Sequence, residues 1–62
     1  MTNDKLLLKV PEAADRLSLS RATVYELLAA GEIKAVHVGR AVRIPAAELE
    51  RWVRERAEVR GA

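Results

Sequence analysis

Side chains that can bind anions or base edges are concentrated in two short segments of the sequence. The first segment supplies Ser20, Arg21, Ala22, Thr23, Tyr25 and Glu26. The second supplies His37, Gly39, Arg40 and Arg43. The planar guanidinium fork of arginine suits phosphate oxygens and guanine edges, and short side chains beside it allow a close approach. The two segments therefore indicate a surface that binds nucleic acid.

The same sequence offers little for catalysis or for a bound cofactor. His37 is its only histidine, and it has no cysteine. We find no glycine-rich phosphate loop and no spacing typical of metal ligands. No pair of carboxylates falls in a plausible pocket, and a core built from 62 residues has little room for one. We therefore expect a protein that is not an enzyme and that holds no metal or cofactor.

The positive charge is concentrated in the middle third of the chain. The formal net charge is only +2, but residues 16–43 alone carry +3, and arginine makes up eight of the eleven cations. A basic segment of this kind is typical of proteins that bind nucleic acid, although small proteins are often mildly basic.

The length and composition indicate a single globular domain. It covers residues 1–62, with a core from about 6 to 59, and half of its residues are apolar. The longest purely apolar run, Leu6-Leu7-Leu8, is far shorter than the ~20 residues of a membrane span. Residues 1–4 lack the features of a secretory signal. We therefore expect a soluble, cytoplasmic, nucleoid-associated protein that has no contact with a membrane.

Two helices joined by a short turn are expected to position the first segment. Apolar residues recur with helical spacing over about 11–17, namely at Val10, Ala13, Ala14 and Leu17. Ser20 is a good N-cap for a second helix over 21–30, and Gly31 suits the left-handed position after its end. The connection of three residues has the length found in helix-turn-helix motifs.

A β-hairpin is expected to position the second segment. Residues 35–38 and 41–44 alternate with period two around Gly39-Arg40. A two-residue loop would place the branched residues of the two strands on opposite faces. A three-residue loop, 39–41, places all four on one face, namely Val36, Val38, Val42 and Ile44, and sets His37 opposite Arg43 on the other. We therefore predict the three-residue loop.

A last helix is predicted over about 46–59. Its buried stripe is expected to contain Leu49, Trp52 and Val53. Its outer side is expected to hold opposite charges four residues apart, in the pairs Glu50–Arg54, Arg51–Glu55 and Arg54–Glu58. This charged side is interpreted as a solvated face, with a partner surface that includes Val59 as the alternative. The fold is therefore mainly α with a small β-hairpin, in the order helix, turn, helix, hairpin, helix.

Each candidate residue has a role on DNA and a simpler structural one. Arg21 can reach a guanine or a phosphate, and Ser20 with the helix N-terminus can hold a phosphate. Thr23 can contact a thymine methyl, and Tyr25 can contact a phosphate. In the structural alternative, Ser20 acts only as a helix cap, the Arg21 side chain is solvated, and Tyr25 packs against the first helix. The hairpin turn presents Arg40 to a minor groove, whose negative potential attracts arginine.

The other two hairpin side chains can hold flanking phosphates. These are Arg43, for which we favour that role, and His37, for which a solvated strand face is the favoured interpretation.

Two runs of residues resemble the excisionase-family, MerR-like helix-turn-helix domains. The first run is residues 10–25, VPEAADRLSLSRATVY, and the second is residues 31–45, GEIKAVHVGRAVRIP, followed by Leu49 and Trp52. The resemblance covers residues 6 to 54. It implies a winged helix-turn-helix, whose second helix enters the major groove and whose wing touches the adjacent minor groove or the backbone. The family includes phage and plasmid excisionases, small prophage regulators and phage packaging subunits.

Two residues depart from this family pattern. Glu26 stands where a basic or polar residue is common, so it either contacts a cytosine amine or turns toward Arg21 or solvent. Lys9 stands where a serine or threonine cap is common, which weakens the start of the first helix by about 1 kcal/mol.

The sequence fits three functions. The leading one is an excisionase, a recombination directionality factor that binds repeated sites cooperatively, bends double-stranded DNA and steers an integrase toward excision. The chain ends soon after the last helix, without the long dimerisation helix of full MerR-type regulators, and this favours the excisionase. A small transcriptional regulator of a mobile element uses the same surface. A protein-interaction module without a DNA role is the third, and Glu26 is the residue that favours it.

Overall fold

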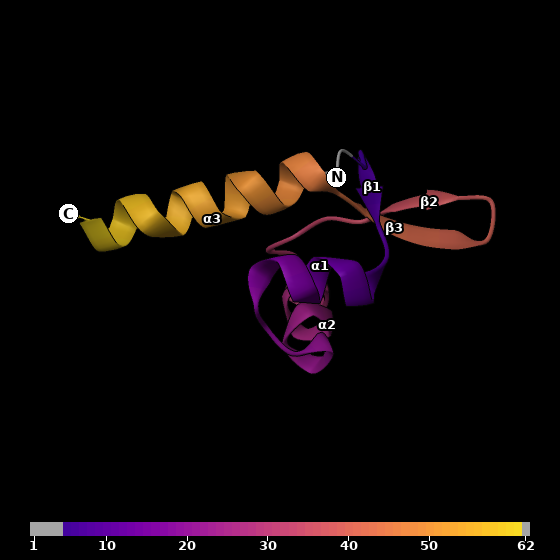
Figure 1. Cartoon of the computed structure of the whole chain (residues 1–62), viewed down its shortest axis with the longest axis horizontal. Helices are drawn as coiled ribbons and strands as arrows, with labels where there is room; N and C mark the ends of the chain where they lie inside the picture. Colours follow the sequence, from indigo (N-terminus) through magenta and orange to yellow (C-terminus); the bar gives the residue numbers. More distant parts are fainter. Residues whose placement is uncertain (1–4, 62) are drawn as a thin grey trace.

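The computed structural model describes residues 5–61 and contains three helices and three short strands within them. In chain order these are β1 (Leu7–Leu8), α1 (Val10–Leu17), α2 (Arg21–Ala29), β2 (Val36–Val38), β3 (Ala41–Pro45) and α3 (Ala46–Gly61). Figure 1 shows α3 and the β2–β3 hairpin extending in opposite directions along the longest axis, with α1 and α2 together on one side of that axis. This is a winged helix-turn-helix, in which the β2–β3 hairpin is the wing.

Helix α1 begins one residue earlier than the sequence predicts and does so without a hydroxyl cap. Lys9 occupies the N-cap position, and the Glu12 carboxylate accepts a hydrogen bond from its backbone N–H at 2.9 Å. This is one half of a capping box, and it compensates in part for the missing serine or threonine. Pro11 lies in the first turn, where its missing N–H costs nothing.

The turn between α1 and α2 is built on Ser18. Its φ is +59°, and the N–H of Leu19 donates to the carbonyl of Ala14 at 2.9 Å. The N–H of Ser18 donates to the carbonyl of Asp15 at 3.1 Å. These two bonds form a Schellman motif, which usually has glycine at the left-handed position. The turn is therefore tight enough to bring α2 directly against α1.

Both ends of α2 follow from single residues that the sequence identifies correctly. The Ser20 hydroxyl accepts a hydrogen bond from the N–H of Thr23 at 3.1 Å, so Ser20 is the N-cap. At the other end Ala30 is the C-cap, one residue short of the predicted helix end, and Gly31 follows with a φ of +78°. Val24 is fully buried between these two ends.

The register of the wing differs from the prediction. Val38 pairs with Ala41, His37 with Val42, and Val36 with Arg43, so that the turn contains only two residues. Gly39 has a φ of +62°, which is the arrangement of a type II′ turn, where glycine is the first central residue. The predicted three-residue loop is wrong.

The reason for this difference is that the wing projects away from the body of the domain. The prediction assumed that the core covers one face of the hairpin and that all four β-branched side chains lie on that face. Val38 is instead 58% exposed, and Val36 and Val42 are exposed as well. Because the core covers neither face along the wing, turn geometry decides the register rather than burial.

The base of the wing is joined to the core through β3, the central strand. β1 pairs with β3 in antiparallel fashion, Leu8 opposite Ile44, giving the order β1-β3-β2. Leu8 and Ile44 are both buried there. Within the described part of the chain, the buried core contains Leu8, Val10, Ala13, Ala14, Val24, Ile33, Ile44 and Leu49. Leu17, Leu27, Leu28 and Trp52 pack partly buried around it, so the core face predicted for the first helix is confirmed.

Helix α3 buries less of its predicted stripe than expected. Leu49 is buried and Trp52 is partly buried, but Val53 is 46% exposed. The prediction that Val53 is buried is wrong, because Val53 lines an open groove beside Arg16 and Leu17 of α1 and stays accessible to solvent there. The predicted Arg54–Glu58 pair and the alternative partner surface with Val59 depend on side chains that lie outside the described residues. Among residues 5–61, none of the helices combines the length and apolarity that crossing a lipid bilayer requires.

Candidate nucleic-acid interface

The exposed face of α2 consists of two rows of side chains. One row contains Arg21, Tyr25 and Ala29, and the other contains Ala22, Glu26 and Ala30. Tyr25 is 59% exposed, so its ring stands on the surface and is not buried against α1. The other side of the helix faces the core through Val24. The face that a partner can reach therefore offers three functional groups, those of Arg21, Tyr25 and Glu26.

Alanines occupy the centre of this face. At about 100° per residue, Ala22 and Ala29 point in nearly the same direction, with Tyr25 on one side of them and Glu26 on the other. Methyl groups in the centre let the helix backbone approach a surface closely. This shape fits a major groove about 12 Å wide, and alanine can also contact a thymine methyl.

The N-terminus of α2 is occupied by its own cap. The hydroxyls of Ser20 and Thr23 lie 2.9 Å apart, and Thr23 is half-buried. Capping is therefore a role that Ser20 has in the structure whether or not a phosphate binds there. Thr23 is directed toward this cap and is less accessible than the neighbouring Ala22.

Glu26 forms no ion pair with any of the side chains that the structure describes. It is exposed, and Arg21 is absent from the same set of ion pairs. Of the alternatives predicted for Glu26, the turn toward Arg21 is thus not adopted here. Its carboxylate is available as an acceptor on the exposed face.

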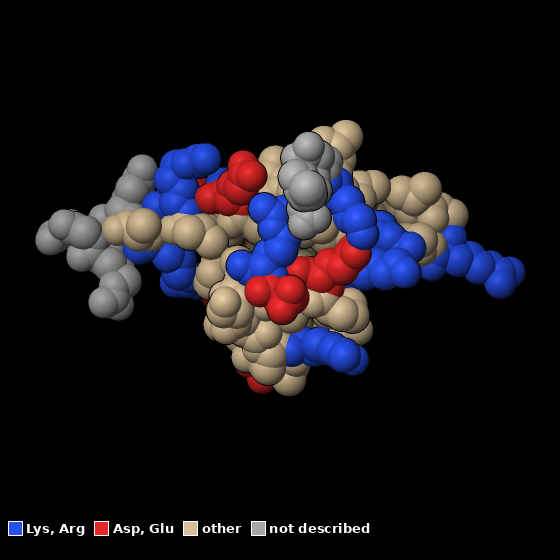
Figure 2. Space-filling model, viewed as in Figure 1, with Lys and Arg blue, Asp and Glu red and all other residues tan. Residues whose placement is uncertain are grey.

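The end of the wing presents a cation. Arg40 is the second residue of the two-residue turn and is exposed. Figure 2 shows Lys and Arg atoms reaching beyond the end of the wing, while the larger groups of Asp and Glu atoms in this view lie over α1 and beside α3. A cation on a narrow turn that projects from the domain has the shape required to enter a minor groove.

The observed register separates the two remaining wing residues. His37 lies opposite Val42 and Arg43 lies opposite Val36, so His37 and Arg43 are on different faces of the hairpin. The prediction that they share one outward face is wrong, for the same reason that the loop prediction is wrong. Arg43 is half-buried, and its guanidinium donates to the carbonyl of Val42 at 3.0 Å.

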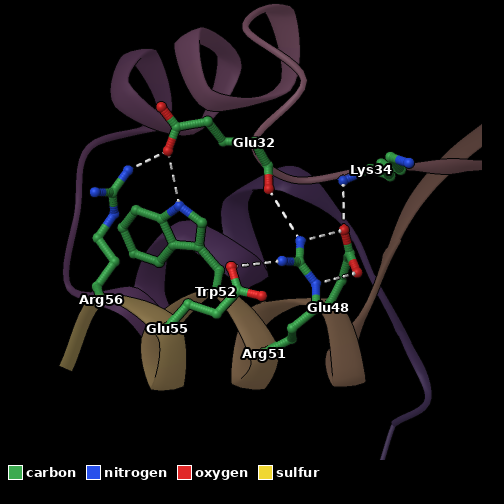
Figure 3. A network of polar contacts seen from close by, with 7 residues as sticks. All are labelled: Glu32, Lys34, Glu48, Arg51, Trp52, Glu55 and Arg56. Carbon is green, nitrogen blue, oxygen red and sulfur yellow. Dashed lines mark hydrogen bonds and ion pairs between the residues drawn. The ribbon is translucent and has the colours of Figure 1, made fainter. Parts of the chain in front are cut away.

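A network of polar contacts between α3 and the loop that follows α2 was not predicted from the sequence. The Arg51 guanidinium donates to both carboxylate oxygens of Glu48, at 3.1 and 2.9 Å, and to the carbonyl of Glu32 at 3.1 Å. The Trp52 indole N–H donates to the Glu32 carboxylate at 3.1 Å (Figure 3). The one sequence signal for it is the indole N–H, which usually finds a partner when tryptophan is partly buried.

Of the ion pairs predicted along α3, one is confirmed. Arg51 and Glu55 are 2.9 Å apart, whereas Glu50–Arg54 is not among the ion pairs of the described residues. The Arg51 guanidinium lowers the pKa of Glu48 below its ordinary value, and the Lys34 backbone N–H lowers it further. Within the same part of the chain no group of three His, Asp or Glu side chains is placed to hold a metal ion.

The fold and the exposed face of α2 define a winged helix-turn-helix domain, a class of domain whose common partner is DNA. Residues 7–57 match the protein family described as "Helix-turn-helix domain", and the chain belongs to that family. Over 42 residues it is 50% identical to a protein named "Probable excisionase" from Saccharopolyspora erythraea. That match covers 68% of this chain and 43% of the relative, so the chain spans less than half of the relative's length. The excisionase-type resemblance inferred from residues 6 to 54 is confirmed.

Proposed function

We propose that this protein is an excisionase, which binds specific double-stranded DNA sites and directs an integrase toward excision. The observation that carries the proposal is the pairing of an alanine-centred face on α2 with a cation at the end of the wing. The name of the relative supports excision as the process. The chain then acts by binding and bending DNA and not by catalysis, at the nucleoid in the cytoplasm.

In this proposal α2 enters the major groove and supplies the base contacts. Arg21 donates to the O6 and N7 atoms of a guanine, and Glu26 accepts from the N4 amine of a cytosine. Tyr25 bonds a phosphate at the groove edge. Ser20 and the free N–H groups at the start of α2 hold a second phosphate, in addition to the capping bond.

The wing supplies contacts outside the major groove. Gly39 allows the tight turn that carries Arg40 into the adjacent minor groove, where the negative potential favours a guanidinium. Arg43 reaches a flanking phosphate once it releases the carbonyl of Val42. His37, on the other face of the hairpin, is the weakest of the proposed contacts.

One copy of the protein is expected to bind weakly. A single helix and a single wing reach about 4–6 phosphates, which corresponds to a salt slope of about −4 to −5. Several copies on repeated sites, bound cooperatively, would supply the missing affinity. Side-by-side binding would also bend the DNA toward the geometry that an integrase needs.

A second candidate is a small transcriptional regulator of a mobile element. It would use the same surface of α2 and the wing, so only the genomic position of the sites separates it from an excisionase. A protein-interaction module, the third candidate, is favoured only by the exposed carboxylate of Glu26.

Selection from genomic DNA tests all three candidates. The purified chain is incubated at moderate salt with sheared DNA from its own host, and the retained fragments are sequenced. We expect clustered repeats beside an integrase gene. Sites near promoters without an integrase gene would instead indicate the regulator, and no enrichment over the input would contradict specific DNA binding by this chain.

A further inference from the structure

The recognition helix and the wing are joined by a single loop, residues 30–35. Helix α2 packs mainly on α1, whereas β3 of the wing packs on β1, on α3 and, to a smaller extent, on α1. The loop is therefore where the end of α2 is tied to the side of the domain that carries the wing. The shared core, with Val24 of α2 and Ile44 of β3, already limits how α2 and the wing can move relative to each other, and freedom in this loop would add to that movement.

Helix α3 binds the backbone of this loop at two points. Arg51 Nη2 donates to the carbonyl oxygen of Glu32 at 3.1 Å. Glu48 Oε2 accepts from the N–H of Lys34 at 2.9 Å. Arg51 and Glu48 also hold each other through two hydrogen bonds, so the two attachment points form one unit (Figure 3). A paired guanidinium and carboxylate have a defined mutual geometry, which single flexible charges lack.

The side chains of the loop add two further anchors. Ile33 lies between the two attachment points and is almost fully buried in the core. The Glu32 carboxylate accepts from the Trp52 indole and pairs with Arg56. The guanidinium of Arg56 lies over the Trp52 ring, 4.7 Å from its centre. We call Glu48, Arg51 and Trp52, which hold the loop, the α3 clamp.

We propose that the α3 clamp positions the wing relative to the recognition helix, so that the two DNA contacts are made as one rigid unit. This inference rests on the proposed function, because it concerns how the same surface binds DNA. If the wing is already fixed relative to α2 in the free protein, the second DNA contact forms without a further loss of conformational entropy. Arg51 is the central positioning residue, although it does not touch DNA itself.

A comparison of variants in two backgrounds tests this role. Arg40→Ala is expected to weaken DNA binding about tenfold in the wild-type protein, since it removes the wing contact. In an Arg51→Met background, Arg40→Ala is expected to weaken DNA binding only about threefold or less, because a wing that is not fixed relative to α2 contributes less to the affinity. A cost of Arg40→Ala that is equal in both backgrounds would overturn the proposal.

A matched control separates positioning from charge. Arg16 is exposed at the end of α1 and is not part of the clamp, so Arg16→Met removes the same charge without touching the loop. In the Arg16→Met background, Arg40→Ala is still expected to weaken DNA binding about tenfold. Should Arg51→Met not fold, Arg51→Lys is measured instead, because it keeps the charge but lacks the planar fork.

A second measurement does not depend on DNA. The chain has no cysteine, so Ala29→Cys and Val38→Cys introduce the only two sites for spin labels, one on α2 and one on the wing. The distribution of label distances is expected to be narrow with Arg51 and clearly broader with Arg51→Met. An unchanged distribution would refute the clamp, whereas a broadened one in a protein that binds no DNA would refute only the proposed function.

Discussion

The indole N–H of Trp52 donates to the carboxylate of Glu32, 20 residues earlier in the chain, at 3.1 Å. Trp52 is the only tryptophan, so its fluorescence reports on this one contact between α3 and the loop after α2. Because the acceptor is a carboxylate, the contact depends on pH.

We expect the Trp52–Glu32 contact to weaken in acid. The Trp52 hydrogen bond, and then the charge of Arg56, lower the pKa of Glu32 below its ordinary value of 4.5. A carboxyl whose pKa is lowered by folding stabilises the fold fully above pH 4.5 and loses that contribution as the pH falls through the lowered value. Tryptophan emission should therefore be constant above about pH 5 and should change below 4.5.

Glu32→Gln is the control for this titration. The amide oxygen can still accept from the indole, but it does not titrate in this range. The change in emission should disappear or shift to the lower pH at which the whole domain unfolds. An emission curve that Glu32→Gln leaves unaltered would show that another group controls it, such as Glu48, whose pKa is also lowered.

Ser18→Gly is expected to stabilise the domain. Ser18 holds a φ of +59° in the turn between α1 and α2, a conformation that costs an L-residue energy and costs glycine almost none. The gain in the free energy of unfolding should be about 0.5–1 kcal/mol, seen as a rise of several degrees in Tm. Gly31→Ala, at a φ of +78°, should change Tm in the opposite direction. A fall in Tm for Ser18→Gly would mean that the serine hydroxyl has a role that these hydrogen bonds do not show.

The elements that sequence reasoning predicted well are those that local chemistry determines. The cap at Ser20, the left-handed Gly31 and the helical spacing of Val10, Ala13 and Ala14 each act within one turn of helix. These signals placed α1 and α2 to within a residue or so at each end, and with them the face that carries Arg21 and Tyr25.

The features that were missed depend on distant parts of the chain. Whether Val36 and Val38 meet a core cannot be known from their alternation, and the structure leaves both exposed. The position of glycine as the first residue of the turn was the better guide to the register. The α3 clamp joins Glu32 to Trp52 and Lys34 to Glu48 across 20 and 14 residues, where no local pattern connects them.

Two arginines of the proposed interface should differ in how their loss affects binding. Arg21→Ala is expected to relax sequence preference, because its proposed contact is to a guanine edge, at a cost of about 1–3 kcal/mol on the preferred site. Arg43→Ala should weaken binding to all DNA sequences alike and should reduce the magnitude of the salt slope of binding by about one. Affinities for specific and scrambled duplexes, measured across a series of salt concentrations, distinguish the two. Unchanged affinity and slope in both variants would rule out the assigned surface.

Glu26→Gln should alter the preferred base. A glutamate on the exposed face of α2 accepts from cytosine and repels phosphate, whereas glutamine suits adenine through its N6 and N7 atoms. We expect a shift from cytosine to adenine at one position, with higher affinity for DNA in general. Selection from a randomised duplex library with both proteins measures the shift, and identical selected sequences would mean that Glu26 faces solvent in the complex.

Ser20 combines a capping role with a proposed phosphate contact, and two substitutions separate these. Ser20→Ala removes the acceptor for the Thr23 N–H and should cost about 1 kcal/mol of stability. Ser20→Asp keeps an acceptor at the N-cap and adds a charge that the helix N-terminus favours, so stability should be retained or increased. That same charge repels a DNA phosphate. Ser20→Asp is therefore expected to be stable but to bind DNA more weakly than Ser20→Ala, provided that both are assayed well below their Tm. If Ser20→Asp binds as tightly as the wild-type protein, no phosphate lies at the start of α2, and Ser20 acts as a cap alone.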